Sequence, residues 1–172
     1  MHVHRFEKIW IGLSLFLIAA FIGIVLFGFT VLELKVPGVS GGETIDPMTI
    51  HETNFGQPGV RKVDGEYEVW MVARKFLFMP GTGQPLVIPA DTEVTFHLTS
   101  PDVLHGFEVV GTNVNSMAIP GQVATFTTRF PDPGEYGVLC NEYCGPAHHT
   151  MEGMIKVVPK DEYDDSNLVA TN

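Results

Sequence analysis

Four side chains that bind soft metals lie within one short stretch of the chain, residues 139–151. This stretch contains the protein's two cysteines, Cys140 and Cys144, followed by His148 and Met151. Thiolate, imidazole and thioether groups together suit copper, whereas calcium and magnesium prefer oxygen ligands. The types and the spacing of these residues therefore indicate a copper site.

The spacing fits some kinds of metal site better than others. Structural zinc sites use four cysteine or histidine ligands, and iron–sulfur clusters normally use four cysteines, so neither kind fits this chain. A blue-copper site uses one cysteine, two histidines and a weak axial methionine, and it would leave Cys140 without a role. Two thiolates four residues apart could instead bridge two copper ions. That arrangement requires a second histidine from elsewhere in the chain.

A disulfide between the two cysteines is the main alternative, because exported domains often contain disulfides. A bridge from Cys140 to Cys144 would close a very small ring, so it would restrict the unfolded chain only slightly. It would also leave His148 and Met151 unexplained. The pattern therefore favours a metal site over a disulfide.

Two histidines outside this stretch are candidates for the second imidazole ligand. His97 lies in the alternating segment 93–99, on the face opposite to the apolar residues, whereas His105 follows Ser-Pro-Asp-Val-Leu and precedes a glycine. That context is typical of a loop, and loops at the end of a rigid scaffold often carry functional residues. His105 is therefore the better candidate. Spacing alone does not distinguish His148 from its neighbour His149.

Two motifs resemble those of a known family. Residues 140–151 read Cys-Asn-Glu-Tyr-Cys-Gly-Pro-Ala-His-His-Thr-Met, and residues 100–107 read Ser-Pro-Asp-Val-Leu-His-Gly-Phe. Both resemble the ligand loops of the CuA centre in subunit II of cytochrome c oxidase. The resemblance extends from the N-terminal apolar segment to about Val158. The second motif is most similar to the B-type (ba-type) oxidases of bacteria and archaea.

The resemblance implies a binuclear copper centre, CuA, that is held by six residues. Two thiolates bridge the copper ions, two imidazoles each ligate one ion, and a thioether and a backbone carbonyl are weak ligands. The thiolates are those of Cys140 and Cys144, and the imidazoles are those of His105 and His148. The thioether is that of Met151, and the backbone carbonyl is that of Glu142. The family pattern selects His148 rather than His149. Asp102 and Asn141 are candidates for contacts around the ligands.

The chain begins with a segment that predicts a membrane anchor. Ile9–Leu32 is a run of 24 uncharged residues, and a helix of this length would be about 36 Å long, enough to cross a hydrocarbon core of about 30 Å. The apolar core of a signal peptide is only about 7–15 residues long, and no Ala-x-Ala cleavage site follows this run. Arg5 and Lys8 favour a cytoplasmic N-terminus. We therefore expect residues 1–35 to be an uncleaved, single-pass anchor in the plasma membrane, with the remainder outside the cytoplasm.

Three further regions follow the anchor. Residues 36–65 are rich in Gly, Pro, Thr and Asp and predict a linker with little regular structure. Residues 66–160 contain short runs of alternating apolar residues separated by turns with Pro and Gly, which predicts a β-sandwich. The predicted strands are 67–73, 93–99, 107–110, 123–130, 136–140 and 154–158. Residues 161–172 form an acidic tail that predicts disorder.

An aromatic stretch, Trp70, Phe76 and Phe78, precedes the ligand motifs. It resembles an aromatic region of the same family near the point where electrons enter. Aromatic residues in a sandwich more often belong to its core, because they bury a large apolar surface. We therefore predict that these three side chains form part of the core.

The resemblance implies an all-β, cupredoxin-like Greek-key sandwich with one transmembrane helix, and a function in electron transfer. Every strong ligand position of the predicted centre is filled by protein, which leaves no open position for a substrate. The chain would accept electrons from cytochrome c or a small copper protein and pass them to heme in subunit I. Oxygen would be reduced to water in that subunit, which holds heme and a further copper.

Charge and the two cysteines help to exclude other partners and functions. The net charge of −10 argues against nucleic acid as a partner. The resemblance implies subunit I and the electron donor as partners, and the apolar N-terminal segment predicts contact with membrane lipid. Two functions from other classes would share most of these features. One is the CuA subunit of a nitric oxide reductase. The other is a membrane-tethered, mononuclear blue-copper carrier, against which the second cysteine argues.

Overall fold

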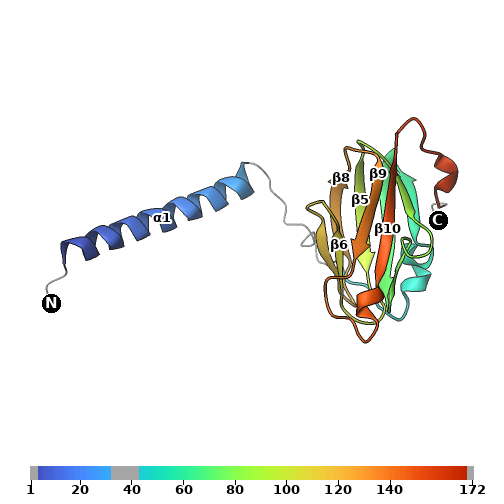
Figure 1. Ribbon diagram of the computed structural model, residues 1–172, viewed down its shortest axis with the longest axis horizontal. Helices are drawn as coiled ribbons and strands as arrows, with labels where there is room; N and C mark the ends of the chain where they lie inside the picture. Colours follow the sequence, from blue (N-terminus) through green and yellow to red (C-terminus); the bar gives the residue numbers. More distant parts are fainter. Residues whose placement is uncertain (1–3, 32–42, 170–172) are drawn as a thin grey trace. The chain divides into compact units, whose positions relative to one another are not determined.

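The computed structural model describes residues 4–31 and 43–169, and the chain divides into two compact units. The first unit, residues 1–36, contains a single long helix. The second unit, residues 37–172, contains all of the β-strands (Figure 1). The prediction of an all-β domain with one N-terminal apolar helix is confirmed.

Helix α1, Arg5–Thr30, forms because its sequence is almost continuously apolar and begins with a capping sequence. The His4 ring accepts a hydrogen bond from the Phe6 amide at 3.4 Å, and the Glu7 carboxylate accepts one from the His4 amide at 2.8 Å. This pair of bonds satisfies backbone groups that have no partner within a helix. Within the described part of the chain, α1 is the one helix that is long and apolar enough to cross a membrane. Leu32, at the end of the predicted span, lies outside the described residues.

Within residues 43–169, ten strands form two sheets that lie in two layers (Figure 1). One sheet has the order β1-β2-β5-β8, with β3 also paired to β2, and the other has the order β4-β10-β9-β6-β7. The pairs β2–β5 and β4–β10 are parallel. The strands are β1 Gly59–Val63, β2 Glu66–Arg74, β3 Leu77–Met79, β4 Leu86–Pro89, β5 Glu93–Thr99, β6 His105–Val109, β7 Asn115–Ala118, β8 Ala124–Arg129, β9 Gly134–Leu139 and β10 Glu152–Val158. Four 3₁₀ turns complete the described structure: η1 Ile50–Glu52, η2 Asn54–Gly56, η3 His148–Thr150 and η4 Asp165–Asn167.

The core lies between the two sheets and follows from the alternation along each strand. In β5, Val94, Phe96 and Leu98 are buried, because successive side chains of a strand point to opposite faces. Phe96 stacks on Phe126 at 5.2 Å between ring centroids, and Phe107 lies against both rings. This aromatic cluster holds the two sheets together.

All six predicted strands are present, with ends shifted by at most two residues. The prediction did not include the four short strands β1, β3, β4 and β7. These strands have three to five residues each, and β1 and β7 contain several polar residues. Such short segments gain their stability from pairing with neighbouring strands, and the sequence gives no clear alternation for them.

The segment 36–65 differs from the predicted linker. From residue 43 onward it is described, and it contains η1, η2 and β1. Ile50 and Phe55 are buried against Val72 and Val123, on the outer face of the first sheet. The apolar residues of this segment are sparse and separated by polar ones, so the sequence shows no periodicity although the segment packs tightly.

The sequence predicts disorder for the acidic tail, residues 161–172. The part of the tail that the structure describes differs from this prediction. The Val169 amide donates a hydrogen bond to the Val60 carbonyl at 2.8 Å, and Asp165 forms an ion pair with Lys62 at 3.3 Å. Tyr163 packs edge-on against Tyr67, and burial is the main cause that raises the pKa of Tyr163 to about 12. The tail therefore contacts β1 and its neighbour β2.

Phe55→Ala tests whether the region before β1 is a linker or part of the domain. Phe55 is 3% exposed and contacts Trp70 edge-on at 4.9 Å. Its truncation should lower the free energy of unfolding by about 3–5 kcal/mol, measured by denaturant titration of the full chain. Met48→Ala, at a side chain that is 79% exposed, is the control and should change stability by less than about 0.5 kcal/mol. If the two variants were equally stable, the region before β1 would be a linker and not part of the domain.

Candidate metal centre

The strand order brings the two predicted ligand loops together. β9 ends at Leu139 and β10 begins at Glu152, and these two residues are paired, so residues 140–151 form the connection between neighbouring antiparallel strands. β6 lies on the other side of β9, with Glu108 opposite Leu139. The antiparallel register therefore directs the beginning of β6, at His105, toward the beginning of the β9–β10 loop.

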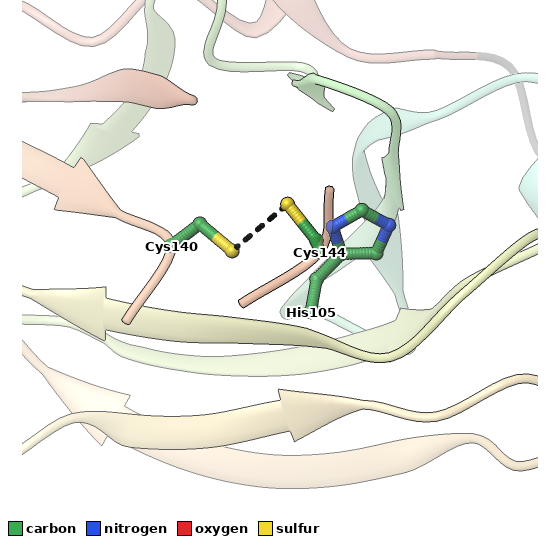
Figure 2. A group of neighbouring side chains, drawn as sticks. All are labelled: His105, Cys140 and Cys144. Atoms are coloured by element: carbon green, nitrogen blue, oxygen red, sulfur yellow. Dashed lines mark hydrogen bonds between the residues drawn. The ribbon is translucent and has the colours of Figure 1, made fainter. Parts of the chain in front are cut away.

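Two cysteine sulfur atoms form the middle of the site. The Sγ atoms of Cys140 and Cys144 are 3.8 Å apart, and Figure 2 shows them pointing toward each other with the His105 ring beside Cys144. One ligand atom from each of these three residues lies within 4.8 Å of the other two, and all three residues are buried. Both cysteines are free, and the separation far exceeds the roughly 2.05 Å of a disulfide. The structure therefore disfavours the disulfide alternative.

The other predicted ligands surround the sulfur atoms. The Cys144 Sγ lies 3.6 Å from His148 Nδ1 and 3.7 Å from Met151 Sδ. The Cys140 thiol donates to the Glu142 carbonyl oxygen at 3.2 Å. His148 lies in η3, and Met151 follows this turn directly and is 2% exposed. The six residues that the sequence predicts as ligands are thus gathered at one end of the sandwich.

The His105 ring has one nitrogen with a partner and one without. Its Nε2 lies 2.9 Å from the Asp102 Oδ1, whereas its buried Nδ1 has no hydrogen-bond partner. A carboxylate on Nε2 favours the tautomer in which Nδ1 carries a free lone pair, which is the form that binds a metal. Leaving a buried polar atom without a partner is costly, so Nδ1 fits the role of a metal ligand. His105 was predicted on a loop and is the first residue of β6.

Asp102 receives several hydrogen bonds in addition to that of His105. The Lys75 amide donates to its Oδ2 at 2.9 Å, and the Val103 amide and the Ser100 hydroxyl donate to its Oδ1 at 2.7 and 3.1 Å. Burial by itself would raise the pKa of the carboxyl. The hydrogen bonds together outweigh burial and lower the pKa of Asp102, so the carboxylate stays ionised beside the ring.

The Cys144 thiol lies in surroundings that disfavour its charged form. Burial, followed by the hydrogen bond and the charge of Cys140, raises the pKa of Cys144 to about 11. Without a metal the group is therefore a neutral thiol at pH 7. A bound cation would reverse this preference, because a metal-coordinated thiol loses its proton. The donor set is soft, buried and free of carboxylate oxygen, which suits copper.

The comparisons with known proteins agree with this geometry. Residues 66–158 match the sequence model of the family described as cytochrome c oxidase subunit II, periplasmic domain. A cytochrome c oxidase subunit 2 from Thermus thermophilus is 35% identical over 156 residues, which cover 88% of this chain and 91% of the relative. The chain belongs to the cytochrome c oxidase subunit II family. A heme-copper oxidase subunit 2 from Aeropyrum pernix is 40% identical over 80 residues, covering 45% of this chain and 34% of the relative.

Solved structures also resemble this member of the subunit II family. A chain in the cryo-EM structure of a heme-copper terminal oxidase dimer has a TM-score of 0.70 and 32% identity, and the match covers 90% of this chain and all of that chain. The periplasmic domain of subunit II of a cytochrome oxidase from Bradyrhizobium japonicum has a TM-score of 0.50 and 19% identity. That match covers 55% of this chain and 86% of the other chain. The second match speaks only to the fold. The cupredoxin-like prediction is confirmed.

Three other histidines, His97, His149 and His51, are not members of this cluster. His97 is on β5, where its ring stacks on Trp70 at 4.2 Å between centroids. His149 is exposed, and His51 is exposed beside Glu52 at 3.8 Å. In the described part of the chain, the cluster with His105 is the one group of three such ligands.

The sequence analysis did not identify Gly106 as part of the site. A Cβ atom at Gly106 would lie 2.8 Å from the amide nitrogens of Asn141 and Glu142, which is too close for carbon. Glycine therefore lets β6 lie directly against the start of the β9–β10 loop. The only signal in the sequence was that this glycine directly follows His105. Asn141, a predicted neighbour of the ligands, donates instead to the Asn115 side chain at 3.1 Å.

Asp102→Asn should weaken metal binding while leaving the fold intact. The amide keeps the size of the side chain but removes the charge that orients His105. Copper affinity, measured by competition with a chelator, should fall by about 10- to 100-fold. Asp91→Asn is the control, because Asp91 is exposed and pairs with Arg129 away from the site. An unchanged affinity in Asp102→Asn would contradict this role.

The reactivity of Cys144 in the metal-free protein should depend steeply on pH. Only the thiolate is alkylated, so with a pKa of about 11 the rate at Cys144 should rise about tenfold per pH unit from about pH 8 to 10. An ordinary cysteine, with a pKa of about 8.5, would level off within this range. Tandem mass spectrometry of the alkylated peptide distinguishes Cys144 from Cys140. A plateau near pH 9 would show that burial does not hold the thiol neutral.

Proposed function

We propose that this protein is the subunit through which electrons enter a membrane heme–copper terminal oxidase, and that it does so through a binuclear copper centre. The observation that carries the proposal is the pair of free, buried thiols 3.8 Å apart, with a partnerless His105 Nδ1 beside them. Membership in the subunit II family supports copper as the metal and the other oxidase subunits as partners.

Six residues would hold the metal. Cys140 and Cys144 would bridge through their thiolates, and the remaining ligands would be His105, His148, Met151 and the Glu142 carbonyl. When bound, two copper ions that share two thiolates supply a carrier of one electron whose geometry changes little on reduction. The protein's part is to exclude water with a buried cluster and to hold the ligand atoms in place.

The ligands differ in how close they lie to solvent. His105 is fully buried, whereas His148 is half-buried and contacts the ring of Tyr143, which is 77% exposed. We infer that a cytochrome c or a small copper protein approaches on the side of His148. Electrons would then pass to subunit I, which would hold the heme and the further copper that reduce oxygen. Oxidases among the relatives favour oxygen over nitric oxide as the acceptor.

The anchor determines where this function takes place. Helix α1 contains the apolar span Arg5–Gly28, and almost all of its side chains are exposed in the structure, so the helix would be covered by lipid and by other subunits. We propose that the N-terminus lies in the cytoplasm, because Arg5 and Lys8 precede the span. The copper domain would then lie on the external side of the plasma membrane, where a mobile donor reaches it.

Electron paramagnetic resonance of the copper-loaded full chain tests the proposal directly. The two bridging thiolates should give a purple protein with two copper ions per chain and one unpaired electron shared equally between them. Copper content and the hyperfine pattern are the measurements. A spectrum from a single copper nucleus, together with one copper per chain, would instead support the mononuclear carrier.

The bridging and the weak ligands should respond differently to substitution. Cys140→Ser removes one bridge and should leave at most one copper ion per chain. Met151→Leu keeps a buried apolar side chain and should retain both ions while shifting the reduction potential, because a weak axial ligand tunes potential more than it holds metal. Copper content and potentiometric titration separate the two results. Two copper ions in Cys140→Ser would refute the bridging role.

A further inference from the structure

The turn between β2 and β3 lies against both ligand loops. Arg74 pairs with Leu77, so Lys75 and Phe76 form a two-residue turn at the end of this hairpin. The Lys75 amide donates to Asp102 at 2.9 Å, and Asp102 in turn contacts His105 Nε2 at 2.9 Å. One side of the turn is therefore connected to the histidine loop through hydrogen bonds.

The other side of the turn contacts the cysteine loop. A Cβ atom added to Gly145 would lie 3.1 Å from both Cε1 and Cζ of Phe76, so the ring packs against the backbone directly after Cys144. Gly145 has a φ of +136°, a conformation that glycine adopts readily. The half-buried Phe76 ring also packs against the core cluster that contains Cys140, Cys144 and Met151.

The β9–β10 loop needs contacts of this kind. At its base the Cys140 amide donates to the Met151 carbonyl at 3.2 Å, and Asn141 donates to Asn115, but the hydrogen bonds of residues 142–150 are local, such as that from the His148 amide to the Gly145 carbonyl at 3.0 Å. Loops with few long-range bonds open more easily than strands. The Cys140 end is held by the strand and by Gly106. The Cys144 end has the Phe76 ring against it.

We propose that the Lys75–Phe76 turn sets the position of Cys144 relative to His105, and that Phe76 is a positioning residue for the copper centre. The inference rests on the proposed function, since it assigns a role around the same ligands. A single rigid turn fixes one histidine through Asp102 and one cysteine through Gly145. The ligand atoms then keep the same separation when an electron arrives or leaves.

Phe76→Leu in the full chain tests this role, with Phe130→Leu as the matched control. Phe130 is 2% exposed and lies before β9, at the end of that strand away from the ligands, so its truncation should destabilise the fold at least as much. In the metal-free protein, alkylation of Cys144 should become roughly 5- to 30-fold faster in Phe76→Leu, the factor that corresponds to about 1–2 kcal/mol of local opening. Phe130→Leu should leave that rate unchanged.

The copper-loaded variants provide a second measurement. Phe76→Leu should retain two copper ions but shift the reduction potential and the hyperfine pattern, and Phe130→Leu should change neither. Phe76→Met, which preserves most of the side-chain volume, should show smaller changes in potential and hyperfine pattern than Phe76→Leu. It takes the place of Phe76→Leu in the test if that variant does not fold. Equal alkylation rates and equal spectra in the Phe76 variants and Phe130→Leu would overturn the inference. Failure of the unsubstituted chain to bind two copper ions would overturn the proposed function instead, and the alkylation comparison would still test the turn.

Discussion

The metal centre depends on how closely two backbone segments approach each other at Gly106. Because this residue has no side chain, the start of β6 lies against the first residues of the β9–β10 loop. That contact brings His105 into the same space as the two thiols. The other contacts around the site, from Asp102 to His105 and from Phe76 to Gly145, stabilise an arrangement that this approach makes possible.

The core and the metal centre are one continuous cluster. Cys140, Cys144 and Met151 belong to the same set of buried residues as Phe107 and Val138. The side chains of these three sulfur-containing residues are therefore packed as apolar groups, and protein interiors are as dense as organic crystals. A site built in this way has little freedom to rearrange when its charge changes, which is a useful property for an electron carrier.

Much of the site could be predicted from the sequence, because its ligands lie in two short motifs. The alternation of β5 correctly placed His97 away from the cluster, and Phe78 is a fully buried core residue as predicted. Phe76 is half-buried and packs against the core cluster, and it also contacts a ligand loop. The Lys75 amide, which donates to Asp102, has a role that no side chain reveals. Contacts of this kind join residues far apart in the chain, so spacing does not indicate them. Spacing also fails to indicate the packing of residues 43–65 and of the tail. The few apolar side chains of these segments pack against residues of the sheet that lie far away in the sequence.

The contact between the C-terminal tail and β1 has a further consequence. β1 is the last strand of its sheet, and a strand in that position offers unpaired backbone groups to any other extended chain. The tail takes up part of this edge through the bond from Val169 to Val60, and it places the charge of Asp165 beside that of Lys62 on β1. The tail therefore leaves fewer backbone groups of β1 open to pairing with another extended chain.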